Sequence, residues 1–208
     1  MLVGNGGSVL FYVVQHDADI TRRLVEFLQQ SDFAGVVFMK EPMEGTFGLE
    51  QAKIDSKHAP DVVMAFRWKD SKNQFDVPGM IDADWQRSAG EGTHATLSRF
   101  DMHNTLIAAG PDFHRGQIDN LPSGNVDVAP TILRILGITP PQKMDGRVLS
   151  EGMVNIDTPA PKPETKEIEA AKDLPSGMWR QSLKISRVGS TIYLDEGNGT
   201  FVSKVEGN

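Results

Sequence analysis

Three short runs of apolar residues dominate the first third of the chain. They cover residues 8–14, 35–39 and 61–66, and each is rich in β-branched or aromatic side chains. Runs of this length without polar alternation are typical of strands that are buried on both faces. The pattern therefore predicts three buried strands in the first part of the chain.

A helix is expected between the first two of these runs. Its apolar positions recur at helical spacing, at Ile20, Leu24, Phe27 and Leu28. Asp17 or Asp19 can cap its first turn. Strand, helix and strand with continuous apolar strands predict the α/β class, with a mostly parallel sheet flanked by helices.

The middle of the chain has weaker periodicity. Residues 69–92 contain several glycines and a proline, and we interpret them as a long surface loop. Residues 105–109 are apolar enough for a short strand. Residues 127–136 predict a helix that Asp127 caps and Gly137 ends.

The last quarter changes in composition. Residues 157–181 are rich in Pro, Lys and Glu, which is typical of a linker-like segment, with a short helix expected at 167–172. Residues 183–188, 191–194 and 200–205 predict strands of a small C-terminal antiparallel hairpin or ribbon, with a turn at 195–199. We therefore expect a partial α/β domain at 1–156, a linker-like segment at 157–181, and a β-ribbon at 182–208 that packs on the same domain.

Composition narrows the classes of function. The 208 residues carry a formal net charge of −7 without a clustered basic patch, so binding to a nucleic-acid backbone is not expected. The absence of cysteine excludes disulfides, thiolate catalysis and Cys-ligated zinc. No apolar run is long enough for a membrane span and no signal peptide is visible, so we expect a soluble chain with no membrane partner. The compartment stays open, as does an exported parent protein.

Polar chemistry is densest at residues 90–104. His94 lies there between small residues, Thr93 and Ala95, which let a ligand approach the backbone. From spacing alone, His94 is either a solvated loop histidine or a metal ligand. Asp101 and His103 could orient a metal ligand, although Asp101 could equally cap a helix or turn. The glycine-rich residues 4–7 precede a strand, whereas a phosphate cradle normally follows one.

Several motifs in this region occur in a recognisable order. They lie at residues 92–94, 101–104, 108–113 with Gly116, 125–132, 136–138 and 145–149. Together they resemble the last active-site stretch of type I phosphodiesterase/nucleotide pyrophosphatases, in the alkaline phosphatase superfamily. The resemblance is dense over residues 90–150 and implies that the chain is the C-terminal part of an alkaline phosphatase-like fold.

The resemblance implies a two-metal phosphoester hydrolase with sites at the carboxyl ends of the parallel strands. His94 matches the family's last metal-ligand histidine, although Ala95 stands where the family usually has Gly. The metal implied is zinc, with manganese as the alternative, and the substrate is a small phosphoester. Thr93, Asp101 and His103 would line the pocket or support the ligand. Asp127, Asp145 and Arg147 are interpreted as structural residues, with a phosphate contact by Arg147 as the alternative.

The family's nucleophile and its other metal ligands cannot be placed in this sequence. No catalytic residue is therefore assigned, and we expect the chain to be inactive or incomplete alone, because a catalytic zinc needs about three protein ligands. A second interpretation is a non-catalytic binding module that self-associates as a homo-oligomer. A third is a metal-free hydrolase that pairs His94 or His103 with Ser98 or Thr96.

Overall fold

The computed structural model describes residues 1–54, 56–83, 92–156 and 161–204, and it divides the chain into two compact units. The first unit comprises Met1–Asn104, Glu167–Lys184 and Leu194–Asn208. The second unit comprises Thr105–Lys166 and Ile185–Tyr193. These boundaries differ from the expected division at residues 156 and 181, because the C-terminal strands contribute residues to both units.

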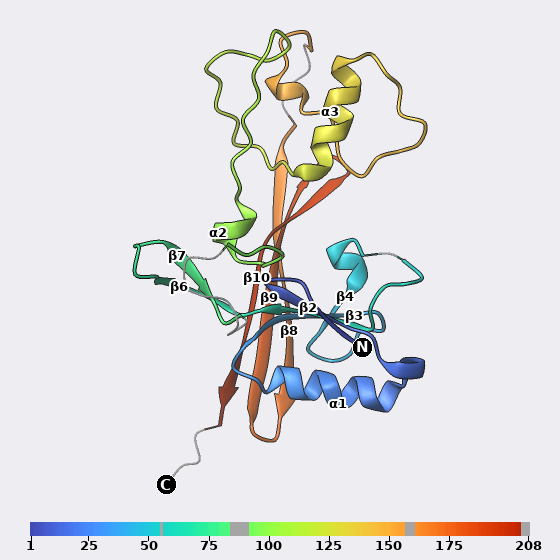
Figure 1. Ribbon diagram of the computed structural model, residues 1–208, viewed down its shortest axis with the longest axis vertical. Helices are drawn as coiled ribbons and strands as arrows, with labels where there is room; N and C mark the ends of the chain where they lie inside the picture. Colours follow the sequence, from blue (N-terminus) through green and yellow to red (C-terminus); the bar gives the residue numbers. More distant parts are fainter. Residues whose placement is uncertain (55, 84–91, 157–160, 205–208) are drawn as a thin grey trace. The chain divides into compact units, whose positions relative to one another are not determined.

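The first unit is built on a five-stranded sheet in the order β1-β2-β5-β3-β4 (Figure 1). The strands are β1 (Leu2–Gly4), β2 (Ser8–Phe11), β3 (Ala34–Met39), β4 (Phe47–Gly48) and β5 (Val62–Phe66). Only β3 and β4 run parallel, and every other neighbouring pair is antiparallel. The α/β class is confirmed, but the sheet is mixed with an antiparallel majority and not mostly parallel.

The strands of this sheet are apolar at consecutive positions because both faces of the sheet are buried, and not because the strands run parallel. Consecutive residues of β3 point to opposite faces, and Val36 and Val37 are both fully buried. Val37 belongs to the core cluster that includes Leu28 of α1 (Ala18–Gln29), whereas Val36 packs near Leu183. Since both faces of the sheet are covered, its strands are apolar throughout even though most of them pair antiparallel.

Two amide side chains bind the C-terminal strands to the backbone of the first unit. Gln181 accepts a hydrogen bond from Val37 N at 2.7 Å and donates one to Val37 O at 3.2 Å. Asn198 makes the same paired contact with Trp68 N and O, at 3.3 and 2.8 Å. Each amide therefore satisfies one backbone donor and one acceptor, as a neighbouring strand would.

The C-terminal strands are longer than expected. They are β8 (Pro163–Leu174), β9 (Gly177–Val188) and β10 (Thr191–Ser203), in the order β10-β9-β8. The segment expected to be linker-like, with a helix at 167–172, instead contains β8 and the start of β9. The turn expected at 195–199 lies inside β10. Charged residues alternate with less exposed ones along β8, and this pattern of an edge strand was mistaken for a solvated linker.

Residues 69–92 were expected to form a surface loop, and this prediction is wrong for the described part. They include most of a hairpin of β6 (Trp68–Lys72) and β7 (Pro78–Ile81), which projects from the first unit in Figure 1. Phe100 lies edge-on to Trp68, with ring centroids 6.0 Å apart. Phe100 belongs to α2 (Arg99–Met102), which thus supports the hairpin. Residues 84–91 of the expected loop lie outside the described residues.

The second unit contains the short helix η3 (Asn125–Asp127), which leads directly into α3 (Val128–Ile135). Gly137, just after α3, has a left-handed backbone conformation. The helix expected at 127–136 is thus present. Residues 105–109, expected as a strand, are exposed and have no regular structure. A third short helix, η4, spans Ser150–Gly152. In the described part of both units, every helix is too short or too polar to span a membrane.

Candidate functional site

His94 lies in an exposed loop of the first unit, which a glycine turn holds in place. Gly7 N donates a hydrogen bond to His94 O at 2.6 Å. A Cβ on Gly6 would come within 2.7 Å of His94 O, and one on Gly7 within 2.2 Å of Thr96 Cγ2. The glycines at positions 6 and 7 are therefore required for close packing against residues 93–96, and not as a phosphate cradle.

His94 lies in an exposed part of this loop. Thr93, His94 and Ala95 are all exposed, and Ala95 adopts a positive φ of 59°. A backbone angle in this region favours glycine, which the resembled family usually has at this position. Ala95 therefore adopts a backbone conformation that is strained for a residue with a side chain.

The loop does not lie at the edge that the resemblance implies. Phe66 N donates to Gly7 O, so the glycine turn adjoins the carboxyl end of β5. Because β3 runs antiparallel to β5, this edge is the amino end of β3, and the carboxyl ends of β3 and β4 lie at the opposite edge. The loop that carries His94 therefore lies next to the carboxyl end of β5, and not at the carboxyl ends of the parallel strands β3 and β4 as the resemblance implies.

The polar residues that follow His94 support the backbone. Thr96 Oγ1 donates to Asp101 Oδ2 at 2.6 Å, and Ser98 caps α2 by accepting from Phe100 N. Thr96 and Ser98 are buried, whereas His103 is exposed. Because both hydroxyls are buried and serve the loop and the helix cap, the structure does not support them as nucleophiles of a metal-free hydrolase.

The described residues of this chain do not form a complete metal site. No group of three or more His, Asp or Glu side chains that could hold a metal ion occurs at residues 1–54, 56–83, 92–156 or 161–204. Thr93, Asp101 and His103 lie on the same segment as His94, but the structure shows no hydrogen bond or ion pair between their side chains and its ring. A zinc ion at His94 would need further ligands from outside these described residues.

Arg147 belongs to a polar network in the second unit. Its guanidinium binds both carboxylate oxygens of Glu151, at 2.6 and 2.8 Å, and Nε donates to the Tyr193 hydroxyl at 3.1 Å. Tyr193 donates in turn to Asp127 Oδ2 at 2.8 Å, and Asp127 Oδ1 accepts from Arg147 N. Asp127 is fully buried, so its carboxylate ties the start of α3 to the segment around Arg147 and does not cap the helix.

This network shifts the pKa values of its members. Burial opposes the charged forms, but the paired hydrogen bonds raise the pKa of Arg147 and lower that of Glu151. Burial and the hydrogen bond to Asp127 raise the pKa of Tyr193 to about 12. At neutral pH, Arg147 and Glu151 are therefore charged and Tyr193 is a neutral donor.

The Asp145-Gly146-Arg147 motif has a packing explanation. A Cβ on Gly146 would come within 1.9 Å of Val126 O, so the backbone passes too close for any side chain there. Asp145 is exposed. Glu151 and Tyr193 were not found in the sequence, because nothing in their local pattern shows that they meet Arg147.

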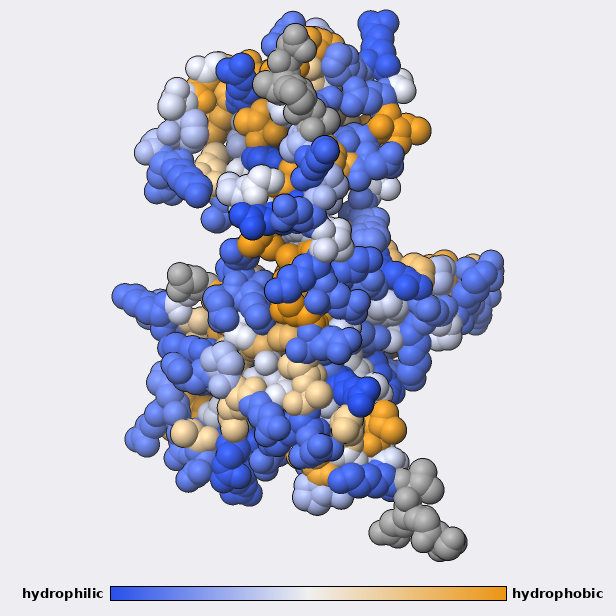
Figure 2. Space-filling view, turned by 180° about the vertical axis from the view of Figure 1, so that it is seen from behind, coloured by the Kyte–Doolittle hydropathy of each residue, from blue (hydrophilic) through white to orange (hydrophobic). Residues whose placement is uncertain are grey.

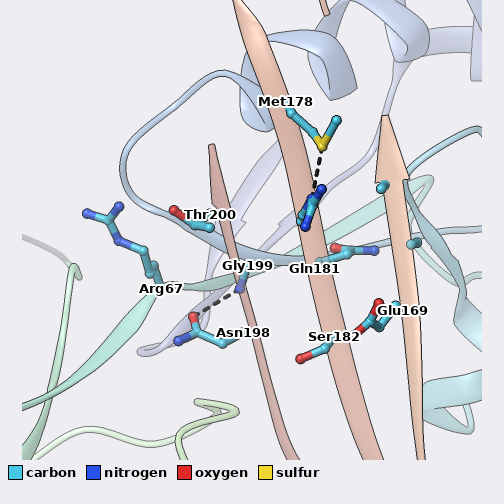
Figure 3. A pocket seen from close by; sticks show the side chains of 11 residues that line it. Arg67, Glu169, Met178, Gln181, Ser182, Asn198, Gly199 and Thr200 are labelled. Atoms are coloured by element: carbon cyan, nitrogen blue, oxygen red, sulfur yellow. Dashed lines mark hydrogen bonds between the residues drawn. The ribbon is translucent and has the colours of Figure 1, made fainter. Parts of the chain in front are cut away.

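A cavity of about 670 Å³ lies on the C-terminal strands of the first unit (Figure 3). Its polar lining includes Arg67, Glu169, Arg180, Ser182, Asn198 and Thr200. Arg67 is paired with Asp82 at 2.7 Å, and Arg180 Nε contacts the Met178 sulfur. None of the site residues expected from sequence lines this cavity, and it contains no histidine.

Comparisons with known proteins show a distant similarity between this chain and one enzyme. The chain is 25% identical over 139 residues to the 2,3-bisphosphoglycerate-independent phosphoglycerate mutases of the Legionella pneumophila strains Lens, Philadelphia 1 and Corby. That enzyme belongs to the alkaline phosphatase superfamily. The match covers 64% of this chain and 26% of each relative, so the chain spans about a quarter of their length. No family model and no solved structure gave a significant match.

Proposed function

We propose that this chain is the C-terminal portion of a metal-dependent phosphoester hydrolase of the alkaline phosphatase superfamily. In this proposal, His94 binds one of two metal ions, and polypeptide outside this sequence supplies the nucleophile and the remaining ligands. The metal is zinc, with manganese as the alternative. The substrate is a small phosphodiester, nucleotide pyrophosphate or phosphomonoester.

The similarity over 139 residues to a phosphoglycerate mutase is the observation that carries this proposal. The exposed loop at His94, fixed by Gly6 and Gly7, supports it because a ligand histidine needs a defined backbone and an accessible ring. In a complete site, the metal pair would polarise the phosphoryl oxygens and stabilise the leaving group. What this chain itself contributes is one positioned imidazole.

Turnover by the isolated chain tests whether it is incomplete. With zinc or manganese added, we expect the purified 208-residue chain to cleave bis(p-nitrophenyl) phosphate no faster than the metal alone. The His94→Ala variant should behave identically. Zinc-dependent turnover that the chain accelerates, and that His94→Ala abolishes, would show that the site is complete without further polypeptide.

The second unit favours a second candidate function, which is self-association. Val128, Ile132 and Leu136 follow one another at helical spacing along α3 and are 40%, 49% and 63% exposed. Ile107 and Ile118 of the same unit are more than 80% exposed. Hydrophobic side chains are visible at the surface in Figure 2 (upper part), and exposed apolar patches often mark protein interfaces.

Sizing chromatography with light scattering distinguishes this candidate. A homo-oligomer whose mass falls toward that of one chain in an Ile132→Lys variant would support self-association through α3. An Arg134→Glu variant, also at an exposed position of α3, serves as the control. A single-chain mass at high protein concentration would contradict this candidate and leave the first proposal unaffected.

A further inference from the structure

A histidine and a carboxylate form a close pair at the turn between β2 and α1. His16 Nδ1 lies 2.6 Å from Asp61 Oδ1. The Asp61 side chain is only 8% exposed, whereas that of His16 is 66% exposed. A buried carboxylate thus holds an imidazole that is largely accessible to solvent.

Asp61 is fixed by contacts with two segments, the end of β2 and the residue that follows β3. Its Oδ2 accepts from Val13 N at 2.7 Å, its backbone N donates to Phe11 O, and its backbone O accepts from Lys40 N. Burial opposes ionisation, but the hydrogen bond from His16 outweighs it together with the bond from Val13, and the pKa of Asp61 lies below its usual value. The carboxylate is therefore ionised and immobile at neutral pH.

This geometry determines the state of the imidazole. An ionised carboxylate only accepts hydrogen bonds, so the neutral form of His16 carries its hydrogen on Nδ1, donates it to Asp61, and has its lone pair on Nε2. The carboxylate also stabilises positive charge that develops on the ring when Nε2 attacks an electrophile. Nε2 lies on the side of the ring away from Asp61, and this side chain is the more exposed member of the pair.

The backbone at this turn is strained. Gln15 and His16 both have positive φ angles, of 57° and 52°, although neither is glycine. Consecutive residues of this kind are unfavourable and persist only where surrounding contacts hold them. The contact from His16 to Asp61 is one such restraint, so the pair and the turn support each other.

The surroundings contain charges of both signs. The positive charge of Lys40 acts on Asp61, and α1, whose amino end attracts anions, begins two residues after His16. Asp17 caps α1 by accepting from Ile20 N, and Asp19 lies in the first turn of this helix. No third metal-ligating side chain joins His16 and Asp61 in the described part of the chain, so these residues do not make a metal site.

We propose that His16 is a nucleophilic imidazole and a site of phosphoryl transfer. Nε2 attacks the phosphorus of a small phosphoryl donor, the new N–P bond forms, and the bond from phosphorus to the leaving group breaks. The Nδ1 proton stays in the hydrogen bond to Asp61, which balances the charge on the phosphorylated ring. Asp61 is a positioning residue. This role is independent of His94 and of the proposed hydrolase.

The five histidines of the chain provide an internal test. His58, His94, His103 and His114 are exposed, and none has a carboxylate within ion-pair distance among the described residues. The protein is treated with potassium phosphoramidate, where ammonia is the leaving group, and phosphorylation is followed by intact mass and by peptide mapping under alkaline conditions. We expect His16 to be modified about tenfold or more faster than the other four.

Two variants test whether the carboxylate of Asp61, and not solvent exposure alone, makes His16 react faster. Asp61→Asn keeps an acceptor for Val13 N but lacks the negative charge, and it should reduce the rate at His16 to that of the other histidines. His58→Asn should leave the rate at His16 unchanged. Equal rates at all five histidines in the unaltered protein, or a rate at His16 unaffected in folded Asp61→Asn, would overturn the proposal. The comparison within the unaltered protein stands even if Asp61→Asn fails to fold.

Discussion

Single glycines decide where the loop at His94 can lie. Gly6 and Gly7 allow a backbone hydrogen bond between the glycine turn and His94, and any side chain at Gly7 would overlap Thr96. The sequence showed a glycine-rich turn, and it showed His94 as a candidate site residue. It did not show that the glycine turn supports the loop at His94, because residues 7 and 94 are far apart along the chain and only the fold brings them together.

Gly7→Ala should destabilise the first unit and displace the loop at His94. The added Cβ would overlap Thr96, and forced overpacking of this kind typically costs about 1–3 kcal/mol. Urea unfolding gives the change in stability, and the NMR resonances of the His94 ring report the displacement. Gly4→Ala is the matched control, since a Cβ there meets nothing within 4 Å. Equal stability of the two variants would contradict this account.

Substitution of Arg147 should lower the stability of the second unit. Arg147→Met leaves Glu151 buried without its partner, since that carboxyl side chain is only 4% exposed. Breaking a buried ion pair in this way costs about 3–5 kcal/mol. Amide hydrogen exchange of the second unit should report the loss, while the exposed Arg134→Met should change protection little. A similar small effect of both variants would show that the network is dispensable.

At the scale of elements, hydrophobic pattern predicted the existence of strands and helices better than their pairing. The three apolar runs overlap β2, β3 and β5, and α1 and α3 were found where expected, because apolar runs and helical spacing are local features of the sequence. When both faces of a sheet are covered, the hydrophobic pattern is the same for parallel and antiparallel strands. The sheet was therefore wrongly expected to be mostly parallel. β8 was missed because its charged residues resemble those of a linker, whereas its pairing partner lies in β9.

The paired amide contacts give the clearest prediction at this scale. Gln181→Met keeps the length of the side chain but leaves Val37 N and O without partners, at about 1–3 kcal/mol for each buried group. We expect lower stability and faster exchange of the Val37 amide hydrogen. Ser182→Ala, the neighbouring position on the other face of β9, should leave that exchange unchanged. Unaltered protection of Val37 in Gln181→Met would contradict the role assigned to this contact.

At the scale of the whole molecule, we propose that this chain holds only part of the site. The motifs from residue 92 to 149 occur in the order of the resembled family, and the chain matches about a quarter of a phosphoglycerate mutase. His94 could be proposed from sequence because its motif is local. The described residues hold no group of three or more side chains that could bind a metal ion, so the two-metal site that we propose would need further ligands.

The most direct test joins this chain to the polypeptide encoded immediately upstream of the Met1 codon and measures zinc-dependent cleavage of bis(p-nitrophenyl) phosphate. We expect turnover by the joined protein, its loss in His94→Ala, and its retention in the His58→Ala control. Turnover that persists in His94→Ala, or an upstream sequence that encodes no phosphoester-hydrolase active site, would show that His94 is not a metal ligand of such an enzyme.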